Sequence, residues 1–167
     1  LAPERVELAL SLKPESVCLV PENRKEVTTE GGLDILSHME RSRDAVKAFT
    51  DAGIPTSMFI DPDEKQLEAS AEIGSPWVEL HTGSFARAWY EQSDRMRELA
   101  ILEKGMEFGI SLGLRVNAGH GINYDNVEGA KQLGQVYEFN IGHSIISRSI
   151  THGLEEAVQT MRALLNK

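Results

Sequence analysis

The sequence has a single cysteine and contains no long run of apolar residues. One cysteine, Cys18, excludes an internal disulfide and fits a reducing compartment such as the cytoplasm. No stretch approaches the roughly 20 apolar residues that a membrane-spanning helix needs. The first residues also do not have the layout of a signal peptide. We therefore expect a cytoplasmic protein without a membrane partner.

Positive charge is scarce as well. Lysine and arginine number 17 against 26 aspartate and glutamate residues, which gives a net charge of -9. Nucleic-acid surfaces carry clustered cations, so this balance argues against a nucleic-acid partner. Phosphorylated small molecules are still suitable ligands, because backbone N–H groups hold a phosphate without many cations.

Short apolar runs alternate with amphipathic stretches along the 167 residues. The runs are rich in β-branched and aromatic residues, which is typical of strands, and the stretches between them have helical periodicity. The predicted strands are residues 17–20, 56–60, 77–81, 114–118 and 136–141, and the predicted helices include 44–52, 64–73 and 95–110. The chain length fits one domain over residues 1–167.

The junctions between these segments indicate a parallel sheet. Three predicted helices end at Gly53, Gly74 or Gly113, and a strand follows within three residues. Such repeated βα units build either a doubly wound sheet or a (β/α)8 barrel. Polar residues near the ends of three strands, Glu79, Asn117 and Asn140, favour the mouth of a barrel. No Gly-x-Gly-x-x-Gly motif supports the other fold. We therefore predict an α/β fold of the TIM barrel type.

Three of the five histidines lie at the C-terminal ends of predicted strands, where the ligands of such folds bind. His120 lies between two glycines, so its imidazole can reach a ligand and transfer a proton near neutral pH. His81 alternates with Glu79, which places both on one face of a strand. A glutamate there must meet a donor or act in acid–base chemistry. A hydrogen-bonded structural role for these residues is the alternative.

Two other kinds of site are suggested by the same strand ends. Gly142 and His143 begin a helical stretch, whose free N–H groups favour an anion, and barrels often hold a phosphate after their last two strands. A metal bound by Glu79, His81 and His120 is the competing interpretation. It is disfavoured because the sequence has no His-x-His or His-Glu-x-x-His spacing.

Residues 21–33 form a long polar segment after the first strand. Loops of this length in barrels are usually lids or binding loops, and the hydroxyl of Thr28 can donate to a phosphate or sugar oxygen. A solvated connector is the alternative.

Four segments carry a family resemblance. They are residues 18–34 (CLVPENRKEVTTEGGLD), 79–83 (ELHTG), 116–124 (VNAGHGINY) and 140–143 (NIGH), and the chain resembles pyridoxine 5′-phosphate synthase over nearly its whole length. The resemblance implies a TIM barrel enzyme of vitamin B6 biosynthesis, a transferase-type synthase. It would condense 3-amino-2-oxopropyl phosphate with 1-deoxy-D-xylulose 5-phosphate and release inorganic phosphate and water. It also implies a homo-octamer without metal or cofactor.

The resemblance assigns roles to individual residues. His120 would be the general acid and Glu79 would stabilise charge or position a reacting group. Thr28 would reach the substrate from the loop, and Gly121 would bind the aminoketone phosphate. Gly142 and His143 would bind the sugar phosphate.

The resemblance also implies that the predicted strands are the fourth to eighth of the barrel. We therefore expect residues 1–167 to be the C-terminal part of a longer chain, without about 70–80 residues that three βα units occupy. On its own this part would lack some catalytic residues. The alternatives are another phosphate-binding barrel, such as an aldolase or isomerase, and a non-catalytic incomplete barrel. A Schiff-base aldolase needs a strand lysine, and none of the predicted strands has one.

Overall fold

The structure is a computed structural model that describes residues 2–21 and 31–166. Its described strands form one parallel sheet in which each strand pairs with the next along the chain. The strands are β1 (Val17–Leu19), β2 (Thr56–Ile60), β3 (Trp77–His81), β4 (Arg115–Gly119) and β5 (Phe139–Asn140). The order β1-β2-β3-β4-β5 is that of consecutive βα units.

Helices connect the strands and flank the sheet. They are α1 (Pro3–Leu12), α2 (Met39–Asp51), α3 (Glu64–Glu72), α4 (Gly83–Ala88), α5 (Gln92–Ser111), α6 (Val127–Ala130), α7 (His143–His152) and α8 (Leu154–Leu165), with 3-10 turns at Leu36–His38 and Lys131–Leu133. None of the helices in the described part of the chain is long and apolar enough to cross a membrane.

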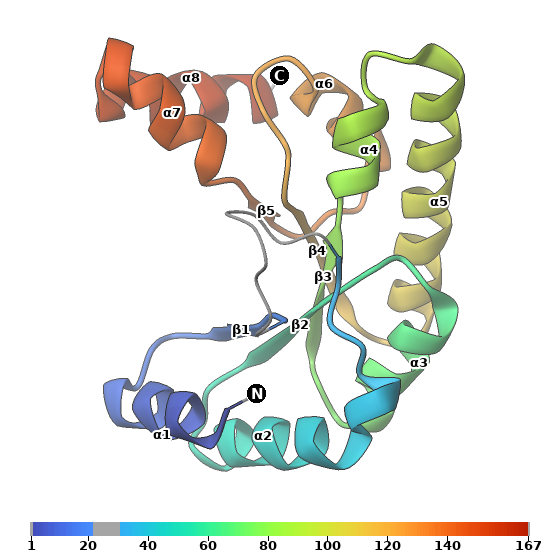
Figure 1. Cartoon of the computed structure of the whole chain (residues 1–167), viewed down its shortest axis with the longest axis vertical. Coiled ribbons are helices and arrows are strands. Elements are labelled where there is room, and N and C mark those ends of the chain that lie inside the picture. Colours follow the sequence, from blue (N-terminus) through green and yellow to red (C-terminus); the bar gives the residue numbers. More distant parts are fainter. Residues whose placement is uncertain (1, 22–30, 167) are drawn as a thin grey trace.

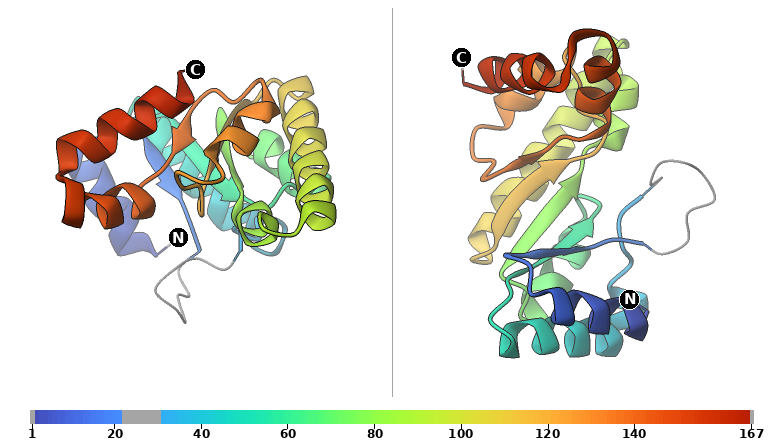
Figure 2. Two further views of the ribbon diagram at one scale, coloured as in Figure 1. Left: turned by 90° about the horizontal axis from the view of Figure 1, so that it is seen from above. Right: turned by 90° about the vertical axis from the view of Figure 1, so that its left-hand side faces the viewer.

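The sheet curves into a half-barrel (Figure 1). Helices α2, α3 and α5 lie along its outer side, whereas α1 and the α7–α8 pair lie near its two ends (Figures 1 and 2). This arrangement confirms the predicted α/β fold with five strands of a barrel. The predicted stops are confirmed too, because Gly53, Gly74 and Gly113 have φ angles of 73°, 81° and 82°, the left-handed conformation that ends a helix.

The core lies between the sheet and the outer helices. Met58, Val78 and Val116 point into it, together with Met106 of α5. Alternation along each strand therefore sends Phe59, Glu79 and Asn117 to the concave face, and these three are paired in register across β2, β3 and β4. The concave face receives polar residues because the convex face is the one that the helices cover.

Some local predictions need correction. The strand predicted at 136–141 is regular only at Phe139–Asn140, although Tyr137 N–H already bonds Val116 O at 2.9 Å. Between the turn at Gly134 and Phe139 the chain bonds β4 without forming a regular strand. The position of Cys18 within an apolar run predicts a small core residue, but Cys18 is exposed on the edge strand β1. Helices α4, α6 and α8 were not predicted.

Candidate active site

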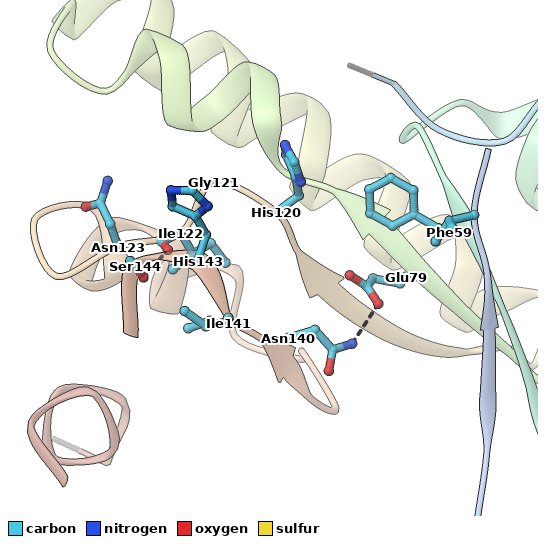
Figure 3. A pocket seen from close by; sticks show the side chains of 12 residues that line it. Phe59, Glu79, His120, Gly121, Ile122, Asn123, Asn140, Ile141, His143 and Ser144 are labelled. Carbon is cyan, nitrogen blue, oxygen red and sulfur yellow. Dashed lines mark hydrogen bonds between the residues drawn. The ribbon is translucent and has the colours of Figure 1, made fainter. Parts of the chain in front are cut away.

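A cavity of about 380 Å³ opens at the carboxyl ends of the strands (Figure 3). This volume is within the range of small-molecule sites, which runs from about 300 to 1,000 Å³. The cavity is lined by Val20, Phe59, Glu79, His120, Gly121, Ile122, Asn123, Asn140, Ile141, Gly142, His143 and Ser144. Five of the residues predicted for the site are therefore close together, whereas Thr28 lies outside the described residues.

Glu79 is the buried carboxylate of this cavity. Asn140 donates a hydrogen bond from Nδ2 to Glu79 Oε2 at 2.7 Å (Figure 3). Cys18 Sγ lies 3.6 Å from the same oxygen. Burial raises the pKa of Glu79, and the hydrogen bond from Asn140 opposes that shift. The prediction that Glu79 must meet a donor is confirmed, and the donor comes from β5.

The Cys18 thiol is affected by the same contact. Although Cys18 is exposed at the sheet edge, neighbouring protein atoms desolvate its thiol. That desolvation and the nearby charge of Glu79 raise the pKa of the Cys18 thiol to about 12. The thiol is therefore a weak donor to the carboxylate and a poor nucleophile.

Gly119, the last residue of β4, makes room for Glu79. A Cβ atom at this position would overlap Glu79 Oε1 and would lie 3.0 Å from the backbone oxygen of Asn140. The glycine therefore allows the carboxylate to lie between β4 and β5.

His120 follows β4 and has a strained backbone, with a φ of 79° that a residue with a side chain rarely adopts. Thr82 holds this conformation, because its Oγ1 lies 2.8 Å from Gly119 O and 2.6 Å from His120 O. The imidazole is half-buried beside the cavity. Desolvation lowers its pKa, and the positive charges of His81, Arg87 and His143 lower it further.

His81 lies behind His120 and is almost fully buried. Its Nδ1 is 2.9 Å from Asp61 Oδ1, and the His81 and His120 ring centroids are 5.0 Å apart. Sequence reasoning did not assign roles to Asp61 and Thr82. Both directly follow strands, at the same edge as the histidines, and this position was the available signal.

The other end of the cavity is formed by the start of α7. Gly142 is the N-cap residue, His143 is the first helical residue, and Ser144 Oγ donates to Ile122 O at 2.9 Å. The free N–H groups of a helix's first turn attract anions. This end of the cavity is therefore suited to a phosphate group.

The competing metal site is not formed. Among residues 2–21 and 31–166, no group of three or more histidine, cysteine, aspartate or glutamate side chains is arranged to hold a metal ion. His81 is paired with Asp61, and Glu79 with Asn140.

Comparison with known protein families agrees with the sequence resemblance. The model of the family described as pyridoxal phosphate biosynthesis protein PdxJ matches residues 1–167. The chain belongs to the PdxJ family. Curated relatives named pyridoxine 5′-phosphate synthase include that of Opitutus terrae, which is 51% identical over 98% of this chain. Those of Prochlorococcus marinus and Pseudoalteromonas translucida are 50% and 46% identical over 97% of it.

These PdxJ relatives are longer proteins. The chain spans 65–66% of their lengths, slightly less than two thirds.

Among solved structures, the CutC protein of Streptococcus agalactiae superimposes with a TM-score of 0.51 over 81% of this chain and 60% of its own, at 15% sequence identity. This likeness concerns the fold alone.

Proposed function

We propose that this PdxJ family member acts in the synthesis of pyridoxine 5′-phosphate, the activity for which its relatives are named. The reaction would condense 3-amino-2-oxopropyl phosphate with 1-deoxy-D-xylulose 5-phosphate and release inorganic phosphate and water. The observation that carries the proposal is the shared cavity. It brings a buried carboxylate, an imidazole and a helix N-terminus to one volume, which suits acid–base chemistry on a phosphorylated substrate.

His120 would be the proton donor to a leaving group. Its lowered pKa makes the imidazolium a stronger acid than free histidine, and the neutral ring that remains can accept a proton in a later step. Imine formation, enolisation and dehydration each need such transfers. A positioned acid or base typically accelerates each of them by about 10²–10⁴-fold.

Glu79 would position or stabilise the reacting nitrogen. A partly desolvated carboxylate interacts strongly with a positive charge that develops on an imine. Asn140 fixes the direction of the carboxyl group by its bond to Oε2. A Schiff base with the protein itself is not part of the proposal, since none of the described strands contains a lysine.

The phosphate groups would bind at the two loops that follow β4 and β5. Gly121 would bind the aminoketone phosphate, and Gly142 with His143 would bind the sugar phosphate. Gly121, Gly142 and His143 all line the cavity, and Gly142 and His143 begin α7. This use of backbone N–H groups agrees with a protein whose net charge is -9.

The proposal extends to the domain and its assembly. Residues 1–167 would be one part of a single (β/α)8 barrel, completed by βα units that pair with the outer edges of β1 and β5. Supporting this, large apolar side chains are exposed near both sheet ends, namely Leu8 and Leu12 on α1 and Ile146 and Ile150 on α7. The complete protein would be a cytoplasmic homo-octamer.

The test is product formation by the full gene product. Purified protein is mixed with the two phosphorylated substrates, and pyridoxine 5′-phosphate and inorganic phosphate are both measured. We expect His120→Ala to lower turnover at least about 10²-fold while the protein stays folded. The matched control is His38→Ala, which removes an exposed histidine that is distant in sequence from His120, and this variant should keep wild-type turnover. Absence of product from wild-type protein would contradict the proposed activity, and near wild-type turnover of His120→Ala would remove His120 from the mechanism.

A further inference from the structure

Two histidine rings lie in contact beside the cavity, and only one of them lines it. His120 lines the cavity, whereas His81 lines a second cavity of about 260 Å³ that also contains Asp61, Ser84 and Glu98. His81 therefore has no direct contact with the main cavity and can affect a reaction there only through its neighbour.

The orientation of His81 is fixed by Asp61. Its side chain is 3% exposed, whereas that of Asp61 is 55% exposed, and the two meet at 2.9 Å between Nδ1 and Oδ1. The hydrogen bond from His81 lowers the pKa of Asp61, so the carboxylate is ionised and only accepts hydrogen bonds. Nδ1 must therefore carry the hydrogen.

The opposite edge of the His81 ring is directed toward His120. His81 Nε2 is buried without a hydrogen-bond partner among the described residues. A Cβ atom on Gly83 would overlap this nitrogen and would lie 3.3 Å from His120 Cδ2, so the absence of a side chain at Gly83 leaves room for the two rings. Phe59 also packs on both, with ring centroids 5.2 Å from His81 and 6.3 Å from His120.

We propose that Asp61 and His81 form a positioning pair for His120. The carboxylate fixes the tautomer and the plane of His81, and the His81 ring, together with Phe59, holds the His120 imidazole toward the cavity. This inference rests on the proposed role of His120 and adds two residues that act through it.

The pair also influences when His120 binds a proton. Among the described residues, the titratable or charged groups that face His120 are His81 from β3, Arg87 from α4 and His143 from α7, and a positive charge on any of them opposes a proton on His120. Asp61, beyond β2, faces His81 and Arg87. Replacing His81 by a neutral residue removes the neighbour that shares the closest ring contact, so His120 should bind its proton at higher pH.

Nuclear magnetic resonance of the histidine rings tests the pair without depending on catalysis. In protein labelled with ¹⁵N, the His120 signals are identified by their loss in His120→Gln, and those of His81 by their loss in His81→Gln. At pH 8 we expect His81 to carry hydrogen on Nδ1 in wild-type protein. In Asp61→Asn it should shift toward the Nε2–H form that free histidine prefers. In His81→Gln the titration midpoint of His120 should move to higher pH.

Turnover of the full gene product gives the second measurement. Asp61→Asn should lower kcat about 10-fold with little change in KM, because the substrate still binds but the proton donor is poorly aligned. The control is Asp44→Asn, which removes an exposed carboxylate on α2 and should change neither the His81 tautomer nor kcat.

Two results would overturn the pair. One is hydrogen on Nε2 of His81 in wild-type protein, and the other is an Asp61→Asn variant with an unchanged His81 tautomer and unchanged kcat. If His81→Gln fails to fold, the Asp61→Asn measurements still decide, because that side chain is half exposed and the change conserves its shape. If the protein makes no product at all, the proposed function fails while the ring signals still report on the pair.

Discussion

The centre of the sheet and its two ends contribute to the site in different ways. Strands β2, β3 and β4 have five residues each and are almost wholly buried, whereas β1 and β5 have three and two residues that are partly or fully exposed. The central strands position His81, Thr82 and His120. The ends provide Cys18, Asn140 and the start of α7.

This difference separates the two tasks of the site. The imidazole of His120 depends on bonds and ring contacts that the buried strands hold in place. The candidate phosphate-binding end depends on backbone N–H groups at Gly142, which need less support from packing. Proton transfer is more sensitive to small displacements than anion binding is, so under the proposed function the acid–base groups would lie in the better packed part of the sheet.

The largest expected contrast is in packing energy. Leu80 in β3 is fully buried, so Leu80→Ala should lower the free energy of unfolding by about 2–5 kcal/mol. Ile150 on α7 is 82% exposed, and Ile150→Ala should change it by less than about 0.5 kcal/mol. Urea unfolding of the 167-residue chain measures both. A cost for Ile150→Ala that matches Leu80→Ala would show that another surface covers α7 in solution.

A smaller contrast is expected for two hydroxyl groups. Thr82 Oγ1 bonds the backbone at His120, so Thr82→Val keeps the shape but leaves a partly buried carbonyl without its donor. We expect a loss of about 1–3 kcal/mol in the free energy of unfolding. Ser149 on α7 bonds only the carbonyl of Ile146 at an exposed position, and Ser149→Ala should cost less than about 0.5 kcal/mol. Equal losses in the free energy of unfolding would contradict the view that side-chain bonds at the centre of the sheet contribute more to stability than those at its ends.

The central elements were the ones that sequence could predict. β2 and β3 have the predicted limits because apolar runs, flanked by glycine and proline, fix both ends of each strand. The predicted fifth strand was too long, since its alternating residues also fit an extended loop next to β4. The core position predicted for Cys18 was wrong, because the apolar sequence pattern of a strand does not distinguish the edge of a sheet from its centre.

The site could be predicted only as far as position along each strand determines it. Glu79 and His120 were found because they lie near the carboxyl ends of strands, and these ends meet on one side of a parallel sheet. The Asp61–His81 bond and the support from Thr82 depend on which loops approach each other across the barrel mouth. That information is tertiary and does not appear in the spacing of residues.

The smallest expected effect concerns the pH dependence of stability at Glu79. Burial raises the pKa of this carboxyl above its ordinary value of 4.5, so between the two values the folded protein binds more protons than the unfolded chain. Stability must then fall as pH rises through that interval. Glu79→Gln removes the titration and keeps an oxygen that accepts the hydrogen bond from Asn140.

The difference between Glu79→Gln and wild type, measured by urea unfolding at several pH values from 4 upward, should therefore grow in favour of the variant as pH rises and then level off. Glu107→Gln, at an exposed position on α5, is the control and should not show this trend. If the variant instead became relatively less stable toward high pH, the charged carboxylate would be stabilised by its contacts with Asn140 and Cys18. The edge strands would then support Glu79 as firmly as the central strands support His120.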